Sequence, residues 1–320
     1  MDVPAANEYR TVERVASVAQ EVIRFVHVLD RQSALAINAA LAARRPLLVR
    51  GEPGLGKTQL AEAAAIDLGW EFRPFAVDAD TETRDLLYRE DLVQRFADAH
   101  VERSAPEPLG RERYIVPGPL WWAFSWKTAN EQMGRVRGGG KSESVDMPAG
   151  TVLLVDEIDK ADSSVPNALL EALARRRFDT PVQSVALDDH RPLLVVFTTN
   201  EERALPDAFL RRCLVLHLTL PDGPAALTKE LIRRGCAHFP DRDAVGVLER
   251  AAQIIVKARQ ELAVSVSSPP GVAEYIDLVD AAIRLDKDGA LLEEIAEFAI
   301  RKHAPAPRDR DGGLKGLQGE

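Results

Sequence analysis

The stretch GEPGLGKT, residues 51 to 58, decides the fold of this chain. It matches the pattern G-x-x-x-x-G-K-[ST] and lies between the apolar run PLLVR (46 to 50) and the helix-prone run TQLAEAAAIDLG (58 to 69). When a glycine-rich turn connects a strand to a helix, the backbone N–H groups of the turn can surround phosphate oxygens. The sequence therefore predicts a phosphate-binding loop between a buried strand and a helix.

The side chains of this loop predict how a nucleotide and its metal are held. We expect Lys57 to reach the β- and γ-phosphates and Thr58 to place its hydroxyl on Mg²⁺. The predicted nucleotide-binding residues are the loop and the residue after it: Gly51, Glu52, Pro53, Gly54, Leu55, Gly56, Lys57, Thr58 and Gln59. The predicted cofactors are ATP and Mg²⁺.

Two further strand ends carry polar side chains that suit nucleotide hydrolysis. VLLVDEID (152 to 159) ends an apolar run with Asp156 and Glu157, where the loop emerges at the carboxyl edge of a sheet. We expect Asp156 to belong to the Mg²⁺ shell and Glu157 to orient and polarise the attacking water. VVFTTN (195 to 200) ends with Asn200, which could hydrogen-bond that water or the γ-phosphate. The alternatives are two solvated acids after a strand and, for Asn200, a turn or helix cap.

The spacing of apolar runs predicts the fold class. Runs that are apolar almost throughout, separated by helical stretches, are typical of strands buried on both faces of a parallel sheet. Beyond the loop strand, the candidates are EFRPFAV (71 to 77), TVLLVDE (151 to 157), PLLVVFTTN (192 to 200) and CLVLHLTL (213 to 220). The sequence predicts an α/β domain.

Helical periodicity at both ends completes the expected organisation. Residues 11 to 29 carry apolar side chains at helical spacing, and a second helix is expected at 32 to 44. After Pro221 every apolar pattern is helical. The predicted organisation is an N-terminal helix (1 to 30), a nucleotide-binding α/β domain (31 to 221), a helical domain (222 to 303) and a disordered tail (304 to 320).

Composition restricts the partners and the compartment. The 320 residues carry a net charge of −9, which argues against broad electrostatic capture of nucleic acid. The N-terminus lacks a signal-peptide pattern, and no apolar run approaches membrane-spanning length. Cys213 and Cys236 form no metal-ligand pattern and read as reduced, structural cysteines. We expect a cytoplasmic protein with no membrane segment.

The motifs in this order resemble those of AAA+ ATPases, and their details are similar to the MoxR group. The stretches that carry the resemblance are PGPLWW (117 to 122), DEIDKADSSVPNALLEAL (156 to 173) and LPDAFLRRC (205 to 213). The resemblance implies a P-loop AAA+ parallel sheet flanked by helices, with a smaller all-helical C-terminal lid domain. It also implies a ring, usually hexameric, that remodels a protein partner, often one with a von Willebrand factor A domain.

The same resemblance gives a role to the arginine pair in LPDAFLRRC. It implies that Arg212 acts as a finger on the γ-phosphate of the neighbouring subunit, with Arg211 as the alternative. Guanidinium suits this role because it stays charged and binds phosphate oxygens in a fixed fork. A surface pair at a helix end is the plainer interpretation. The resemblance also implies a lid arginine that contacts the nucleotide, near the start of a late helix. The sequence departs from the family here, because the stretch 265 to 285 has no arginine before Arg284.

Two other functions and one other feature remain open. A nucleotide-gated switch or scaffold with slow turnover would use the same site residues, and a nucleic-acid motor of AAA+ type is less favoured by the acidic charge. Trp121, Trp122 and Trp126 fall within WWAFSW. They predict packing against the core in preference to a loop that grips a client.

Overall fold

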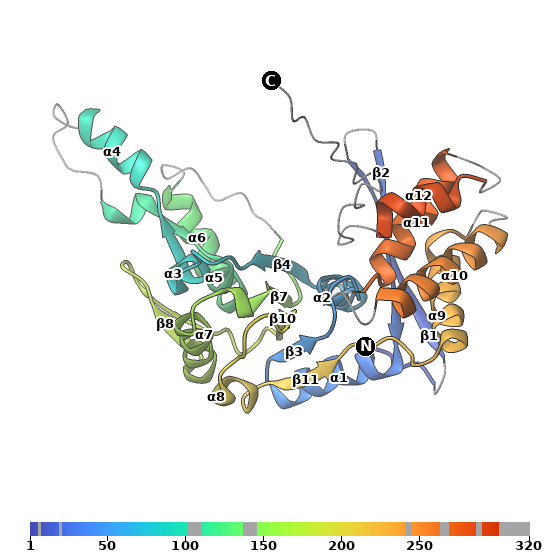
Figure 1. Cartoon of the computed structure of the whole chain (residues 1–320). Helices are drawn as coiled ribbons and strands as arrows, with labels where there is room; N and C mark the ends of the chain where they lie inside the picture. Colours follow the sequence, from blue (N-terminus) through green and yellow to red (C-terminus); the bar gives the residue numbers. More distant parts are fainter. Residues whose placement is uncertain are drawn as a thin grey trace, which may run out of the picture. The chain divides into compact units, whose positions relative to one another are not determined.

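The computed structural model in Figure 1 describes residues 1–5, 8–18, 21–101, 110–136, 146–240, 245–262, 269–285 and 290–300. The chain divides into two compact units, Met1–Leu220 and Pro221–Glu320. The first unit contains all strands of the described residues, and the described residues of the second form helices alone. The predicted tail, 304 to 320, lies outside the described residues.

A five-stranded parallel sheet forms the centre of the first unit, as predicted. Its strands are buried because their sequences are apolar almost throughout. In their order across the sheet they are β11 (Leu214–His217), β3 (Leu47–Arg50), β10 (Leu193–Thr199), β7 (Thr151–Asp156) and β4 (Glu71–Ala76). Since all five run in the same direction, the residues that follow β3, β7 and β10 meet at one edge.

Helices cover both faces of this sheet. Successive side chains of a strand point to opposite faces, so Leu154 of β7 packs with α1 (Arg31–Ala43) and α2 (Lys57–Leu68), whereas Val155 packs with α5 (Pro119–Phe124) and α7 (Ser164–Arg175). Two apolar cores result, one on each face. They fix the strand ends from which the site residues emerge.

The prediction of an N-terminal helix is wrong. Tyr9–Val18 (β1) and Glu21–Asp30 (β2) form an antiparallel hairpin. The valines of this segment recur at intervals that suit a helix, but they are β-branched and favour strands. Side chains two residues apart on a strand point to the same face. Arg10 and Arg14 therefore share a face of β1 with the buried Val12, and they form ion pairs with Asp67 and Glu62 of α2. The helix predicted at 32 to 44 is confirmed as α1.

The segments between β4 and β10 carry small additional elements that the sequence did not predict. Two short antiparallel pairs, β5 with β6 and β8 with β9, lie outside the central sheet. The elements are α3 (Thr83–Leu87), β5 (Tyr88–Glu90), α4 (Leu92–Val101), η2 (Arg111–Tyr114), β6 (Ile115–Pro117), α6 (Trp126–Val136), η3 (Ile158–Lys160), β8 (Arg177–Asp179) and β9 (Ser184–Ala186). After β10, α8 (Asp207–Leu210) leads into β11.

The tryptophan cluster packs as predicted. Trp121 is fully buried and donates a hydrogen bond from Nε1 to Thr128 Oγ1 at 2.9 Å. Trp126 is 8% exposed, and its ring lies edge-on to that of Trp122. The guanidinium of Arg73 lies 5.0 and 4.9 Å from the centres of the Trp122 and Trp126 rings. These contacts tie α5 and α6 to β4.

The second unit has the helical composition that the sequence predicts. Its described helices are α9 (Pro224–His238), α10 (Val245–Leu262), α11 (Val272–Leu285) and α12 (Leu292–Ile300). They pack around the fully buried Tyr275, Leu278 and Ala251. No helix in the described parts of either unit is long and apolar enough to cross a membrane.

Candidate nucleotide site

The loop between β3 and α2 has the backbone geometry of a phosphate cradle. Gly51, Gly54 and Gly56 all have positive φ angles, of 145°, 77° and 88°. A side chain at Gly51 would bring its Cβ within 2.4 Å of the Leu218 carbonyl oxygen. Glycine is therefore required at this position for conformation and for space. Among the other loop residues, Leu55 is buried, whereas Glu52 and Gln59 are exposed.

Lys57 is the first residue of α2, and its side chain turns back over the loop. It is 7% exposed, and Nζ donates hydrogen bonds to the carbonyl oxygens of Gly51 at 2.7 Å and Glu52 at 2.9 Å. Burial lowers the pKa of Lys57, while Asp156 and other nearby carboxylates act in the opposite direction. A cation enclosed by the loop is placed to exchange carbonyl partners for phosphate oxygens.

Thr58, Asp156 and Thr198 form one hydrogen-bonded group. The Thr58 hydroxyl lies 3.0 and 2.9 Å from the two carboxylate oxygens of Asp156. Thr198, on the adjacent strand β10, donates its hydroxyl to Asp156 Oδ1 and accepts a hydrogen bond from the Glu157 backbone N–H at 2.8 Å. Thr58, in the first turn of α2, thus meets Asp156, at the end of β7, although the two are 98 positions apart in the sequence.

Glu157 is held by partners on both of its carboxylate oxygens. Asn200 donates from Nδ2 to Oε1 at 2.7 Å, and Lys160 donates from Nζ to Oε2 at 2.6 Å. The pairing with Glu157 raises the pKa of Lys160. Glu157 itself has a φ of 57°, in the left-handed region that residues with side chains rarely adopt. Such strain is concentrated at functional sites.

A turn that the sequence analysis did not single out supports Asn200. Glu201, the next residue, also has a positive φ, of 62°, and forms an ion pair with Arg50 at the end of β3. Asp159 is 2% exposed and accepts a hydrogen bond from the Glu202 backbone N–H at 3.0 Å. These contacts fix the backbone immediately after β10 and so fix the position of Asn200.

The arginine pair lies at the opposite edge of the sheet. Arg211 and Arg212 follow α8, directly before β11, and both are exposed. Within the described residues, neither guanidinium has a hydrogen bond or an ion pair. Their backbone is held instead by Arg45, whose guanidinium donates to the carbonyl oxygens of Arg211, Arg212 (3.1 Å) and Cys213 (3.2 Å). The pair therefore lies away from the phosphate loop of the same chain.

Sequence reasoning missed Thr198, Lys160, Asp159 and Arg45. Thr198 and Asp159 lie inside motifs that were recognised, so a count of polar residues at each strand end would have indicated them. Lys160 follows Glu157 by three residues, a spacing at which charged side chains can meet. Arg45 has no local signal, because its three partners lie 166 to 168 residues away in the sequence.

Comparison with known proteins supports a nucleotide-binding domain. The family described as AAA domain (dynein-related subfamily) matches residues 46–213, just over half of the chain. Chaperone protein ClpB 1 of Nostoc sp. is 29% identical over 182 residues, which cover 57% of this chain and 17% of that protein. The chain therefore spans less than a fifth of that relative.

Solved structures with a similar arrangement share little sequence with this chain. A RuvB mutant from Thermotoga maritima has 17% identity and a TM-score of 0.39 over 81% of this chain and 70% of its own. A candidate ATPase from Cytophaga hutchinsonii has 17% identity and a TM-score of 0.40 over 83% of this chain and 78% of its own. Neither likeness is close enough to carry an argument about function.

Proposed function

The chain belongs to the AAA domain family of the dynein-related subfamily, and from that premise we propose that it is a Mg²⁺-dependent ATPase of MoxR type. The family supports nucleotide binding and ATP hydrolysis. The finer proposal is that hydrolysis occurs at subunit interfaces of a cytoplasmic ring, usually a hexamer, and remodels or matures a protein partner. A protein with a von Willebrand factor A domain is the proposed partner class.

The arrangement around Glu157 is the observation that carries the ATPase proposal. Glu157 lies at the end of β7, one residue after Asp156, and Asn200 of the next strand is in hydrogen-bond contact with it. In the proposed reaction Glu157 orients and polarises the attacking water, and Asn200 positions that water or the γ-phosphate. Lys57 and the backbone N–H groups of the loop bind the phosphates.

The oxygen atoms at Thr58 and Asp156 suit Mg²⁺. Hydroxyl and carboxylate oxygens are hard donors, and Mg²⁺ in phosphate sites uses one or two such protein ligands beside phosphate oxygens and water. When bound, the ion neutralises charge on the phosphates. The contact between Thr58 and Asp156, at 2.9 to 3.0 Å, already holds both donors on the same side of the loop.

The exposed arginines support a shared site. Arg212, or Arg211 in its place, is proposed to reach the γ-phosphate bound by a neighbouring subunit. Both lie at the sheet edge opposite to their own phosphate loop, and within the described residues neither side chain has another partner. A guanidinium without an intramolecular partner is free to bind phosphate in a second subunit.

A second candidate function, a nucleotide-gated switch with slow turnover, has one observation in its favour. Both carboxylate oxygens of Glu157 are occupied, by Asn200 and by Lys160. Two acceptor sites of this carboxylate are therefore taken, which leaves fewer to orient an attacking water. If turnover is slow for this reason, ATP occupancy would act mainly as an assembly signal.

Steady-state phosphate release at increasing protein concentration distinguishes the two functions. A remodelling ATPase with shared sites should show a specific activity that rises as subunits assemble. A switch should assemble with ATP, as measured by light scattering, while its turnover stays low at every concentration. The absence of both phosphate release and ATP-dependent assembly at every protein concentration would contradict both proposals.

A further inference from the structure

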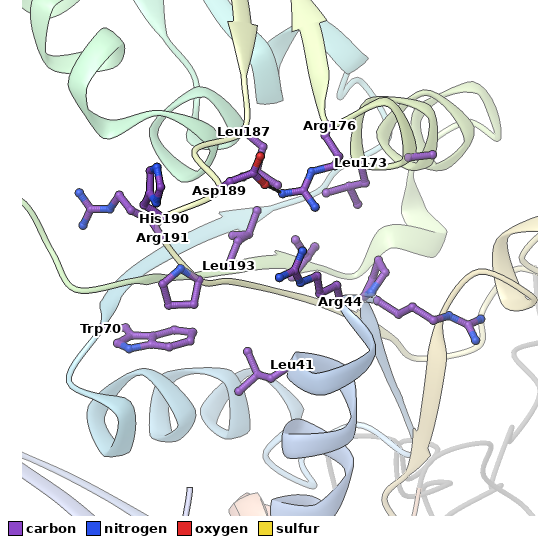
Figure 2. Close-up of a pocket in the computed structure, with 15 residues that line it drawn as sticks. Leu41, Arg44, Trp70, Leu173, Arg176, Leu187, Asp189, His190, Arg191 and Leu193 are labelled. Carbon is purple, nitrogen blue, oxygen red and sulfur yellow. Dashed lines mark hydrogen bonds and ion pairs between the residues drawn. The ribbon is translucent and has the colours of Figure 1, made fainter.

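A cavity of about 520 Å³ lies at the amino-terminal edge of the sheet, opposite to the phosphate loop. Its volume falls within the roughly 300–1,000 Å³ of ligand pockets. Figure 2 shows that the strand starts form its floor and that the ends of α1 and α7 face each other across it. The lining residues come from three segments, around Arg44, around Arg176 and from Leu187 to Val195, together with Trp70.

The cavity is cationic although the chain is acidic. Four arginines line it, Arg44, Arg45, Arg176 and Arg191, against one carboxylate, Asp189. Asp189 is already in an ion pair with Arg176, and Arg45 is bound to backbone carbonyls. Within the described residues Arg44 has no hydrogen bond or ion pair from its side chain, and Figure 2 shows it pointing into the cavity. Arg191 also lacks a side-chain partner among the described residues, but in Figure 2 it points away from Arg44 and Leu193. One carboxylate would therefore find the guanidinium of Arg44 free there.

Backbone strain marks this cavity in the same way as the nucleotide site. In the described residues four residues other than glycine have positive φ angles: Arg44 (52°), Glu157 (57°), Arg176 (53°) and Glu201 (62°). The two glutamates belong to the nucleotide site, and both arginines line this cavity. Arg44 and Arg176 are the C-terminal caps of α1 and α7, where glycine is the usual residue.

The rest of the wall is apolar. Trp70 packs against Gly150 and Pro192, since a Cβ on Gly150 would lie 2.6 Å from the Trp70 ring and 3.0 Å from Pro192. Leu41 and Leu193 lie between this ring and Arg44 in Figure 2. A ligand that fills the cavity must combine a negative group with an apolar body.

We propose that this cavity binds an acidic peptide segment of a partner protein, with its carboxylate on Arg44 and a neighbouring apolar side chain against Trp70 and Leu193. Guanidinium and carboxylate form two parallel hydrogen bonds, which gives the site a preferred orientation. Asp189 in the wall and the net charge of −9 oppose a nucleic-acid backbone, which would bring several negative charges at once. The site is separate from the nucleotide site and does not depend on ATP hydrolysis.

The test is selection of peptides from a phage-displayed library of random heptapeptides on the full chain. The selected sequences should carry Asp or Glu beside a large apolar residue. A fluorescein-labelled synthetic copy of the strongest binder should bind Arg44→Glu at least tenfold more weakly in fluorescence anisotropy. A control peptide with Gln in place of Glu, or Asn in place of Asp, should bind the unchanged chain more weakly to the same extent. Excess ATP should not displace it.

Two variants separate loss of the site from loss of the fold. Arg44→Gly removes the side chain and suits the left-handed backbone, so it should fold and still lose peptide binding. Arg89→Glu makes the same charge change at an exposed position of β5 outside the cavity, and it should bind as the unchanged chain does.

Several outcomes would overturn the proposal. No enriched sequence, enriched sequences without an acid, or equal binding to Arg44→Glu would each do so. Binding of a single-stranded oligonucleotide with the same dependence on Arg44 would assign the cavity to phosphate. Loss of self-association in Arg44→Glu, without any peptide binding, would assign it to a second copy of the chain.

Discussion

Asn200 donates a hydrogen bond from Nδ2 to Oε1 of Glu157 at 2.7 Å, across the ends of the neighbouring strands β10 and β7. The two residues are 43 positions apart in the sequence, and the parallel pairing of their strands brings them together. Lys160 occupies the other carboxylate oxygen at 2.6 Å. The position of Glu157 therefore depends on two partners that can be removed one at a time.

Glu157→Gln should stop ATP turnover and leave nucleotide binding intact. Glutamine keeps the shape and the hydrogen bond with Asn200 but removes the negative charge that polarises water. Loss of a general base reduces turnover by roughly 10²- to 10⁴-fold. Phosphate release and binding of a fluorescent ATP analogue measure the two effects, with Glu171→Gln, on the exposed surface of α7, as the control. Unimpaired hydrolysis in Glu157→Gln would sink the assignment.

Lys160→Met should raise turnover severalfold, because it removes a hydrogen-bond donor from Oε2 of Glu157 and leaves that oxygen free to accept from the attacking water. The ion pair is partly exposed, with side-chain exposures of 39% and 34%, so stability should change by less than about 1 kcal/mol. Initial rates of phosphate release and urea denaturation provide the two measurements. A fall in turnover with unchanged ATP affinity would instead show that Lys160 supports the reaction.

The sequence could indicate which residues gather at the candidate nucleotide site because their signals are local. Lys57 and Thr58 follow a glycine pattern, and Asp156 and Glu157 end an apolar run, so a single strand or turn reveals each pair. Partners that depend on strand order could not be predicted in the same way. Thr198 meets Asp156 only because β10 lies beside β7, and Arg45 meets Arg212 only because β11 lies beside β3.

The sequence predicted the segments that are buried on all sides and mispredicted the N-terminal segment, which is only partly buried. Strands such as β7 are apolar on both faces, and a short run of this kind fits few structures other than a buried strand. The N-terminal segment has a mixed pattern, with Val12 buried and Val15 61% exposed, and this fits a helix or a strand equally in periodicity. Ion pairs from Arg10 and Arg14 to α2 are long-range contacts that help to fix the hairpin, and no local pattern contains them.

Mixing two inactive variants should restore part of the activity if the site is shared. Arg212→Ala lacks the proposed finger and Glu157→Gln lacks the proposed base. In a ring assembled at random from equal amounts, about a quarter of the sites would pair an intact Glu157 with a neighbour's intact Arg212. Phosphate release by the mixture should approach that fraction of the unmutated rate. No recovery would contradict a role for Arg212 at the site of the neighbouring subunit. If Arg211→Ala is inactive while Arg212→Ala hydrolyses ATP normally, the role belongs to Arg211.

Arg44→Gly should stabilise the first unit slightly. A left-handed conformation costs a residue with a side chain about 1–2 kcal/mol, and the greater freedom of glycine in the unfolded chain returns about 0.4–1 kcal/mol of this. The expected net gain in free energy of unfolding is roughly 0.5 kcal/mol, measured by urea denaturation. Ala42→Gly, on the exposed face of the same helix, should lose about 1 kcal/mol because its backbone is helical. A loss of stability in Arg44→Gly would refute the strain at this cap.

Cys213 should report whether Arg45 holds the arginine pair in place. Burial raises the pKa of the Cys213 thiol to about 12, so at pH 8 the group is almost entirely in its unreactive protonated form. Cys236 is exposed, and replacing it by serine leaves Cys213 as the single thiol. In that background Cys213 should react slowly with a disulfide reagent at pH 8 and rapidly once the chain is unfolded in urea.

Arg45→Ala in the same background should make Cys213 react about tenfold faster, because three backbone carbonyls from Arg211 to Cys213 lose their common donor and the segment opens. ATP turnover should fall in parallel, while ATP binding, at the other edge of the sheet, should stay unchanged. Arg45→Lys should give intermediate values, since an ammonium lacks the planar fork that reaches several acceptors. Arg44→Ala, one residue away, is the matched control and should leave Cys213 protected. Fast reaction of Cys213 with normal turnover in Arg45→Ala would show that the clamp orders the segment without positioning the finger.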